Sequence, residues 1–331
     1  MTFYLKRVVV ECSEKGLRSD VRETILERMS QFPLNNRHGA AALDKEAANA
    51  FGEAADGFDA EGMVSRDCLE GWIRELSQSG LEVIILRENM QFVSKKQDKQ
   101  DIPALYITDS PQKAHGHIRQ GEPVMALLTA ENQGEDFAGV KYLSMHLTEI
   151  SADYLDKVYR RYAGIPWDIL ETERCFLRET TESDVDAFYE IYADPSITAY
   201  MENLYPDREQ ELAYTRDYIK NVYELYGHGV WTVCLKETGQ VIGRAGLSFR
   251  EGFEDAELGF VIGVTWQGRG IATEVCKAVL EFGARELGFE RVIAFVEPDN
   301  RISRHLLKKL GFEEREEVEL GGKTHVLYRK S

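Results

Sequence analysis

The sequence predicts an α/β protein with two domains, residues 1–168 and residues 169–331. Short apolar runs of strand type alternate along the chain with longer segments in which apolar residues recur every three or four positions, as on a helix. At 331 residues the chain is long enough for two hydrophobic cores of ordinary size. The segment Ala163-Gly164-Ile165-Pro166-Trp167-Asp168 contains the turn residues expected at a domain boundary.

In the first half, strands and helices follow each other in regular alternation. The expected strands are 6–10, 81–86, 103–108, 124–128 and 140–145, and the expected helices are 67–79, 112–119 and 152–162. Because parallel strands need a crossover connection, which is usually a helix, this order predicts a doubly wound parallel sheet. We therefore expect residues 1–168 to form a Rossmann-like domain.

The second half has more strands and a different order. Strands are expected at 175–179, 230–235, 241–249, 256–262, 291–296, 312–319 and 324–329. A first helix is expected to run through Tyr192, and further helices at 209–226, 269–287 and 301–309. Thr181 and Asp184 have the spacing of a capping box at the start of the first helix. The second helix places Tyr214, Tyr218, Val222 and Leu225 on one side.

Gln267-Gly268-Arg269-Gly270-Ile271-Ala272 is the most informative stretch, because it connects an apolar strand to a helix. Glycines let the backbone turn sharply and approach a ligand, and the first N–H groups of a helix attract anions. The turn lacks the Lys-Ser or Lys-Thr of a P-loop and the third glycine of the Rossmann motif. A different pyrophosphate-binding turn is therefore predicted.

The pattern Gln-x-x-Gly-x-Ala at 267–272 resembles the turn of the GNAT superfamily of N-acetyltransferases. The segment 297–303, Glu-Pro-Asp-Asn-Arg-Ile-Ser, followed by Leu310-Gly311-Phe312, is similar to the family's second conserved block. The resemblance covers about residue 173 to the C-terminus and implies a GNAT fold with a mixed, mostly antiparallel sheet. Glu-Leu-Gly-Phe at 257–260 and Asn-x-x-Ser at 300–303 are typical of the branch with ribosomal-protein alanine acetyltransferases.

This resemblance implies acetyl-CoA as co-substrate and an amine as acceptor. The residues that it assigns to the cofactor are Val261, Ile262, Val264, Gln267, Gly268, Arg269, Gly270, Ile271, Ala272, Asn300 and Ser303. Asn300 is expected to orient the cofactor arm rather than to cap a helix. The arginines expected near the ribose phosphate are Arg269, Arg301 and Arg304, each of which could instead form an exposed salt bridge.

Acetyl transfer needs a base, because a free alkylamine has a pKa of roughly 10 and must lose a proton before it attacks the thioester. Glu257 lies on the strand before the turn and is the candidate; the alternative is that it pairs with a neighbouring arginine. Backbone N–H groups after Phe260 are candidates for the oxyanion, and Gly259 and Gly263 suit a bulge or a close backbone approach there.

The acid that protonates the leaving thiolate is less clear. Many GNAT enzymes have a tyrosine seven residues after the asparagine, but this chain has Leu307. Ser303 is the nearest replacement, and its alternative role is a helix-terminal hydroxyl that bonds a free amide. The acceptor is expected to contact residues in the loop between the first two helices and in a later turn, namely Tyr200, Met201, Tyr205, Asp207 and Gly321.

The first half faintly resembles the haloacid dehalogenase superfamily, with Asp109 where that family holds a metal-binding aspartate. The match is degenerate. Glu11-Cys12-Ser13-Glu14 follows the first strand in place of the nucleophilic Asp-x-Asp, and Lys113 stands where a second carboxylate would bind magnesium. A working phosphatase is therefore not expected, and no metal site is predicted.

The net charge of −17, with both halves acidic, disfavours nucleic-acid binding and would attract a cationic acceptor. Five scattered cysteines without a Cys-x-x-Cys spacing indicate reduced thiols. No apolar run approaches the length of a membrane span, and no signal peptide is visible, so a cytoplasmic location is expected. The oligomeric state cannot be predicted.

The function expected from these features is acetyl-CoA-dependent N-acetyl transfer to a primary amine, either a small cationic amine or a peptide or protein N-terminus. One alternative is an acyl-CoA sensor without turnover, which Leu307 favours and Glu257 opposes. Another is a bifunctional acetyltransferase and phosphohydrolase, which Lys113 and the missing Asp-x-Asp oppose.

Overall fold

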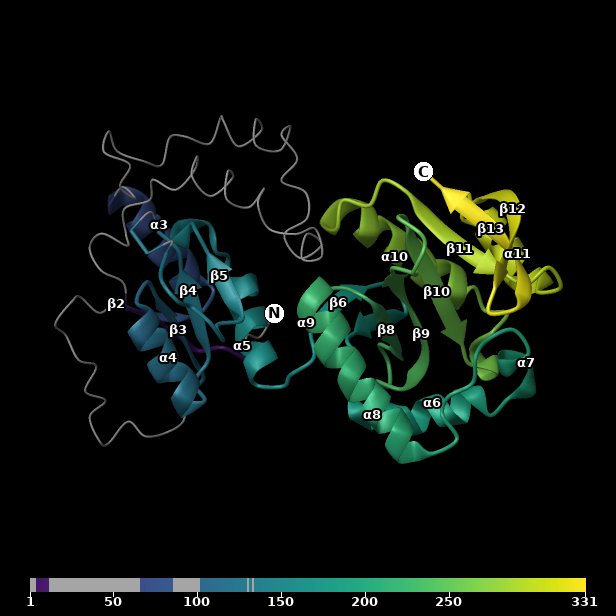
Figure 1. Ribbon diagram of the computed structural model, residues 1–331, viewed down its shortest axis with the longest axis horizontal. Helices are drawn as coiled ribbons and strands as arrows, with labels where there is room; N and C mark the ends of the chain where they lie inside the picture. Colours follow the sequence, from purple (N-terminus) through teal and green to yellow (C-terminus); the bar gives the residue numbers. More distant parts are fainter. Residues whose placement is uncertain (1–3, 12–65, 86–101, 130, 133) are drawn as a thin grey trace. The chain divides into compact units, whose positions relative to one another are not determined.

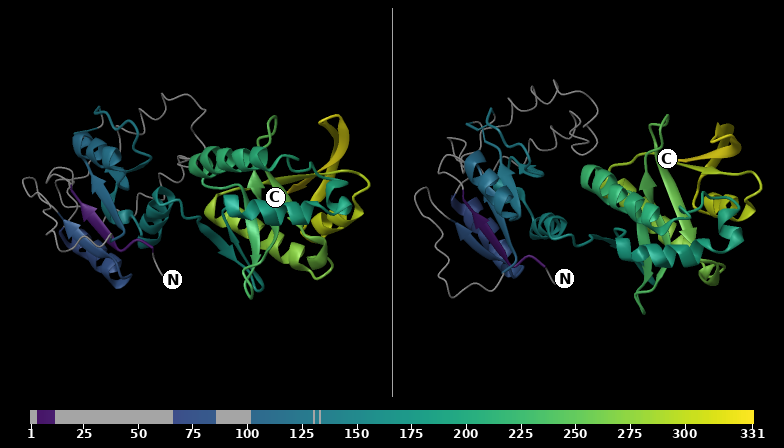
Figure 2. Two further views of the ribbon diagram at one scale, coloured as in Figure 1. Left: turned by 90° about the horizontal axis from the view of Figure 1, so that it is seen from below. Right: turned by 60° about the horizontal axis from the view of Figure 1, so that its bottom comes forward.

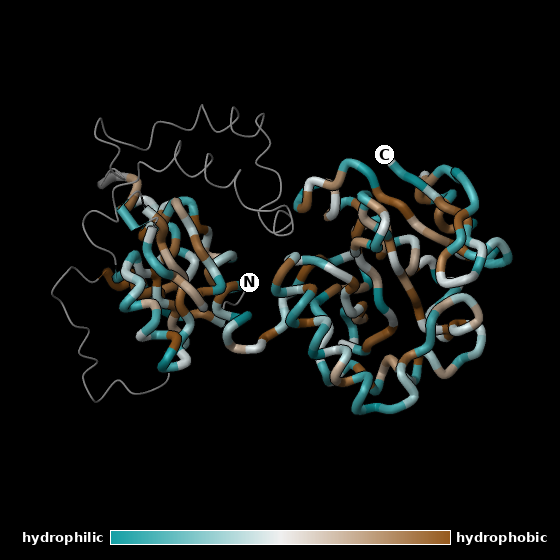
Figure 3. Tube along the Cα trace, in the orientation of Figure 1, coloured by the Kyte–Doolittle hydropathy of each residue, from teal (hydrophilic) through white to brown (hydrophobic). Residues whose placement is uncertain are grey.

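The computed structural model describes residues 4–11, 66–85, 102–129, 131–132 and 134–331 (Figure 1). The chain divides into two compact units, Met1–Ile165 and Pro166–Ser331. In each unit hydrophobic residues concentrate along the central strands of the sheet (Figure 3). Among the described residues no helix is both long and apolar enough to cross a membrane.

The first unit has a five-stranded parallel sheet in the order β2-β1-β3-β4-β5. Its strands are β1 (Arg7–Val10), β2 (Glu82–Ile85), β3 (Ala104–Thr108), β4 (Val124–Leu127) and β5 (Tyr142–Ser144), and its helices are α3 (Arg66–Gln78), α4 (Pro111–Gln120) and α5 (Ala152–Tyr162). Helices α3 and α5 pack on one face, where Trp72 and Leu155 join the core formed by Val8 and Ile107. Helix α4 contacts β3 and β4. The resemblance to the haloacid dehalogenase superfamily stays a prediction.

The second unit has an eight-stranded sheet in the order β12-β13-β11-β10-β9-β8-β7-β6. The strands are β6 (Asp168–Glu171), β7 (Cys175–Arg178), β8 (Val230–Leu235), β9 (Val241–Ser248), β10 (Ala256–Ile262), β11 (Val292–Val296), β12 (Glu313–Leu320) and β13 (Lys323–Lys330). Only β10 and β11 run parallel, and all other neighbours are antiparallel. The sheet is therefore mixed and mostly antiparallel.

Strand β6 was not predicted. It pairs with β7 through Asp168 and Arg178, so the second unit begins before the predicted boundary at residue 168. The segment Asp168-Ile169-Leu170-Glu171 contains only two apolar residues and lies on the edge of the sheet, which leaves it without the apolar run of a central strand.

Helices cover both faces of this sheet (Figures 1 and 2). They are α6 (Val185–Tyr192), α7 (Pro195–Thr198), α8 (Arg208–Tyr218), α9 (Glu224–Tyr226), α10 (Ile271–Glu286) and α11 (Arg301–Lys309). On one face α10 and α11 bury Val275, Val279 and Leu307 in the main core. On the other face α6 packs Phe188 and Tyr192 against Val261 of β10. The predicted capping box of Thr181 and Asp184 precedes α6.

Helices α8 and α9 are joined by a π-helical turn, Ile219–Tyr223, so that the predicted helix 209–226 is continuous but not regular. Tyr214, Tyr218 and Val222 face a cavity, as their predicted common side implies. The predicted fourth member, Leu225, is instead 60% exposed, and Tyr226 takes its place at the cavity. The wider π turn shifts the following residues by one position, which sequence periodicity did not reveal.

Two tyrosines of this helix hold the start of β8. Strand β7 ends at Arg178, opposite Thr232, so Val230 lies beyond the last paired residue of that strand. The hydroxyl of Tyr218 accepts the Val230 N–H (2.8 Å), and the hydroxyl of Tyr223 donates to the Val230 carbonyl. A Cβ at Gly229 would lie 2.8 Å from the Tyr218 hydroxyl, so the close approach requires glycine there.

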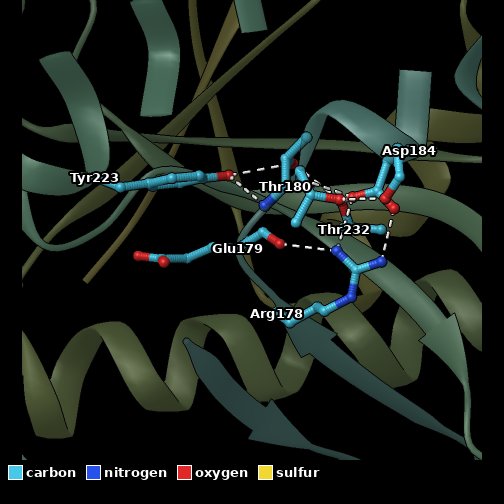
Figure 4. Close-up of polar contacts among 8 residues, drawn as sticks. Arg178, Glu179, Thr180, Asp184, Tyr223 and Thr232 are labelled. Carbon is cyan, nitrogen blue, oxygen red and sulfur yellow. Dashed lines mark hydrogen bonds and ion pairs between the residues drawn. The ribbon is translucent and has the colours of Figure 1, made fainter. Parts of the chain in front are cut away.

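A buried polar network continues from Tyr223 to the start of α6 (Figure 4). The Tyr223 hydroxyl accepts the Thr180 N–H (3.2 Å), and the hydroxyls of Thr180 and Thr232 are 3.0 Å apart. Thr232 donates to Asp184, which forms a bidentate ion pair with Arg178 at 2.6 and 2.7 Å. Burial raises the pKa of Tyr223, so its hydroxyl stays neutral. The network fixes the helix against the sheet.

We expect Tyr223→Phe to lower the free energy of unfolding of this unit by about 1–3 kcal/mol, because the buried Val230 carbonyl would lose its partner. Hydrogen exchange of peptides from β8 and β9, measured by mass spectrometry, reports this unit separately from the other. Tyr226→Phe is the control, since Tyr226 is 40% exposed and should cost about 0.5 kcal/mol or less. Equal exchange in the two variants would contradict the role of the Tyr223 hydroxyl.

Candidate functional site

The turn at 267–270, which is predicted to bind an anion, lies at the start of α10. Gly268 and Gly270 have φ of +70° and +78°, and Gly270 is the N-cap residue. The first main-chain bond back to the turn comes from Glu274, whose N–H donates to the Gly270 carbonyl (3.1 Å). Within the described chain, the N–H groups of residues 268–273 donate no main-chain hydrogen bond. Such a set of amides at a helix N-terminus binds phosphate.

Arg174 holds this turn in place. Its guanidinium donates to the Arg269 carbonyl (2.9 Å) and to the Glu274 carboxylate (2.7 Å), and Glu274 also accepts the Arg174 N–H. At the other end of the turn, the Gln267 amide donates to the Ile262 carbonyl (2.8 Å). Arg174 was missed by sequence reasoning because it lies nearly a hundred residues before the turn.

Strands β10 and β11 separate directly before the cradle. They pair only at Ala256 and Glu257, after which β10 continues to Ile262 beside β9, and β11 continues to Val296 beside β13. The edge of β10 that faces this gap can therefore hydrogen-bond an extended ligand in the manner of an added strand. β9 and β10 stay in register from Glu257 to Ile262, so the bulge considered at Gly259 is absent.

On the face of the sheet toward α6, one glycine of β10 leaves the surface bare. A Cβ on Gly259 would meet only Val230 at 3.8 Å, whereas a Cβ on Gly246, which lies opposite on β9, would overlap the Gly229 backbone. On one side of this glycine pair, Val261 of β10 is opposite Arg244 of β9. On the other side, Glu257 of β10 is opposite Ser248 of β9. The alternation along a strand places these six residues on one face.

A cavity of about 400 Å³ lies over this bare surface. Its walls are aromatic, with four tyrosines, Tyr192, Tyr214, Tyr218 and Tyr226, from α6 and from the helix with the π turn. Gly259, Phe260 and Val261 of β10 also line it, so it borders the strand that leads to the cradle. The volume is in the range of small-molecule sites.

Comparison with known proteins agrees with this geometry. The family model described as "Acetyltransferase (GNAT) domain" matches residues 174–313. The Uncharacterized N-acetyltransferase p20 of Bacillus licheniformis is 33% identical over 150 residues, which cover 44% of this chain and 83% of that protein. The chain belongs to the GNAT acetyltransferase family.

Two further relatives show how far the similarity extends. The [Ribosomal protein uS5]-alanine N-acetyltransferase of Escherichia coli is 37% identical over 76 residues, 22% of this chain and 39% of that protein. A solved structure of a putative GnaT-family acetyltransferase from Bordetella pertussis aligns with a TM-score of 0.44 and 23% identity, over 50% of this chain and all of the other. By the family model and the Bacillus licheniformis relative, this chain is a GNAT enzyme, an acyltransferase, and acetyl-CoA is the acetyl donor of its family.

Glu257, the predicted base of this GNAT enzyme, is ion-paired. Its carboxylate accepts two hydrogen bonds from Arg250, at 2.6 and 3.1 Å, and its side chain is 14% exposed. Glu257 also lines a second, shallower hollow of about 420 Å³ with Arg250 and Gly321. The structure therefore shows the arginine pairing that sequence analysis left as an alternative, beside the bare glycine surface.

The second conserved block lies at the start of α11. Asn300 is the N-cap residue, and its side chain accepts the Ser303 N–H (3.1 Å). This differs from the expectation that Asn300 would orient the cofactor rather than cap. The Ser303 hydroxyl is half-buried, and the described residues give it no hydrogen bond. Leu307 is completely buried in the core, so its position offers no acid.

The three arginines expected near the ribose phosphate differ in their surroundings. Arg304 is engaged within the fold, with Glu314 (3.1 and 3.2 Å), the Tyr328 hydroxyl (2.9 Å) and the Pro298 carbonyl (3.0 Å). Arg269 stacks over the ring of Trp266, and Arg301 is exposed. Arg304 is therefore a salt-bridging residue, and Arg269 and Arg301 remain candidates.

The expected acceptor residues are only partly brought together. Met201 lines the tyrosine-walled cavity and Gly321 lines the shallower hollow. Asp207 caps α8, and the two exposed tyrosines of the loop, Tyr200 and Tyr205, line neither space. Within the described part of the chain, no cluster of three or more His, Cys, Asp or Glu residues could hold a metal ion.

Sequence reasoning missed two polar residues of the cavity, Arg244 and His228. The His228 ring is buried, and Nδ1 lies 3.0 Å from the Leu247 carbonyl, which requires a proton on Nδ1. Arg244 stands alone as a charge in the strand Val241-Ile-Gly-Arg-Ala-Gly-Leu-Ser. A lone charge in an apolar strand is the signal that could have found it.

We expect Gly270→Val to weaken CoA binding by roughly tenfold or more, since φ of +78° costs a β-branched residue about 1–3 kcal/mol, and relief of that strain would turn the amides away from the phosphates. Calorimetric titration with CoA measures the affinity. Gly288→Val, at φ of +68° just after α10, is the matched control for strain alone. Unchanged affinity in Gly270→Val would remove the cradle from the binding site.

Proposed function

We propose that residues 169–331 move the acetyl group of acetyl-CoA to a primary amine by direct attack of the amine on the thioester. The observation that supports this most is the unpaired amide cradle at the start of α10, beside the point where β10 and β11 separate. A ligand with a pyrophosphate and an extended amide-containing arm matches both features.

In this proposal the pyrophosphate lies on the N–H groups of residues 268–273, with Gln267 and Arg269 flanking it. The arm follows the open edge of β10 and meets the main-chain groups of Val261 and Ile262. The side chains of these two residues are buried, with 5% and 4% exposed, so they are not available to the ligand. The side chains of Val264, which is 43% exposed, and Ala272 pack against the cofactor arm. A backbone N–H after Phe260 stabilises the oxyanion.

The amine enters from the tyrosine-walled cavity. Its nitrogen attacks the thioester carbonyl, the C–S bond breaks, and the thiolate of CoA leaves with the bonding electrons. We propose that the proton of the amine passes to Glu257 through a water molecule, because Arg250 occupies both carboxylate oxygens directly. The Ser303 hydroxyl is proposed to donate to the leaving thiolate.

The acceptor class proposed from the sequence is a small cationic amine or a peptide or protein N-terminus. The Escherichia coli relative, whose printed name specifies an alanine of a ribosomal protein, supports the second option. The acidic net charge of −17 supports the first. We further propose that the protein acts in the cytoplasm and that residues 1–168 form a separate domain without catalytic activity.

We expect Glu257→Gln to lower turnover by about two to four orders of magnitude while acetyl-CoA affinity changes little, because a positioned proton acceptor contributes about that much. A thiol-release assay over a panel of amines measures the rate. Glu251→Gln, next to Arg250 in the sequence and exposed, is the control. An unaltered rate would assign the base to another group, and a wild type that binds CoA without turnover would favour the acyl-CoA sensor.

We expect the chain to lack phosphatase activity. At the carboxyl end of β1, the Glu11 carboxylate lies 3.0 Å from Nε2 of His117, and Lys113 donates to the Glu11 carbonyl (3.4 Å). Residues 12–14 lie outside the described chain. The protein should not hydrolyse p-nitrophenyl phosphate with magnesium, and hydrolysis that disappears in Asp109→Asn would establish a second enzyme in this half.

A further inference from the structure

Arg244 places a positive charge inside the tyrosine-walled cavity. It lies in the middle of β9, opposite Val261, and its guanidinium carbon is 4.8 Å from the centre of the Phe188 ring. Its Nε is buried and has no hydrogen-bond partner in the described chain. The charge therefore lies between the sheet and α6, at the wall of a space large enough for a small ligand.

The other partly buried arginines of this unit have carboxylate partners. Arg178 pairs with Asp184, Arg304 with Glu314 and Arg329 with Asp255. The arginines of this unit without an ion pair are Arg244, Arg269 and Arg301, and the last two are exposed. Arg244 thus differs from its neighbours in being enclosed without an acidic group within the described residues.

The tyrosines around Arg244 do not neutralise it. Burial raises the pKa of Tyr192 and of Tyr218, although the nearby guanidinium, which also hydrogen-bonds Tyr192, offsets part of this rise, so both hydroxyls stay uncharged. A cation over an aromatic ring gains about 0.5–2 kcal/mol, whereas an enclosed charge without a countercharge costs several kcal/mol. Phe188 and the tyrosines therefore leave much of the cost uncompensated.

The phosphates of the cofactor are not the missing anion. The cradle residues 267–272 are absent from the lining of this cavity, whereas Gly259 and Val261 of the strand beside the acetyl group belong to it. An anion that meets Arg244 must enter with the acceptor. A carboxylate suits a guanidinium best, because two parallel hydrogen bonds can form.

We propose that the acceptor carries a carboxylate which Arg244 binds, so that the substrates are amines of the amino-acid class with an apolar or aromatic body. This inference rests on the proposed acetyl transfer. The bond changes stay as described, and the carboxylate is not consumed: the C–N bond forms, the C–S bond breaks, and the amine proton goes to the base. The tyrosines would pack against the apolar body.

Binding can be tested without turnover. With CoA present, we expect 3-phenylpropionate to bind the full-length protein at least about tenfold more tightly than 3-phenylpropionamide, because the amide lacks the charge but keeps the shape. Arg244→Met should remove this preference and Arg244→Lys should keep part of it. Arg216→Met, an exposed arginine of α8 paired with Glu182, should leave it unchanged. Unaltered CoA affinity confirms that each variant is folded.

Turnover separates this inference from the proposed function. The ratio of kcat/KM for L-phenylalanine to that for L-phenylalaninamide should fall by roughly tenfold or more in Arg244→Met, and comparing the variant with the wild type cancels the different basicities of the two amines. An equal loss with both amines would overturn the inference and give Arg244 a structural or oxyanion role.

The inference also fails if neither carboxylate is preferred over its amide. Arg244-dependent binding of 3-phenylpropionate without any turnover would instead contradict acetyl transfer and leave the anion site in place.

Discussion

The arrangement of the second unit depends on the hydrogen bonds made by the main-chain N–H and carbonyl of Val230. These two groups lie where β7 has ended, and the hydroxyls of Tyr218 and Tyr223 replace the missing strand. Because each tyrosine also belongs to the wall of the cavity or to its support, one pair of hydrogen bonds joins the sheet, the helix and the site. Gly229 leaves room for the two tyrosine rings. The network through Asp184 gives the buried hydroxyl groups around Tyr223 their hydrogen-bond partners.

We propose two anion sites of different construction, one after the end of β10 and one on the neighbouring strand β9. At the first, main-chain amides would bind a phosphate without a basic side chain, in a turn that is exposed to the solvent. On the face toward α6 a single guanidinium is enclosed by aromatic rings. The net charge of −17 applies to the chain as a whole and would favour a cationic acceptor, but the charged side chain that lines the cavity is that of Arg244.

Much of this architecture could be predicted because local chemistry determines it. The glycine turn at 267–270 and the capping box of Thr181 follow from residues that are close in sequence, whereas the mixed, mostly antiparallel sheet was implied by the resemblance to the GNAT superfamily. The partners of Arg174, Arg304 and Glu257 could not be predicted in the same way, since a salt bridge depends on which charges the fold brings together. Asn300 was expected not to cap, but its side chain accepts the Ser303 N–H at the start of α11. Strand β6 was missed because an edge strand needs little apolar sequence.

The π turn lets the helix between residues 208 and 226 present side chains at a strict interval of four. On a regular α-helix such an interval advances by about 40° at each step, so that Tyr214 and Tyr226 would point about 120° apart. The wider turn at Ile219–Tyr223 takes up part of this drift and keeps both rings at the same cavity. The π turn thus accommodates one additional residue: without it, Tyr226 would follow Tyr214 by eleven positions, which a regular α-helix places about 20° apart, so both rings would still face the cavity.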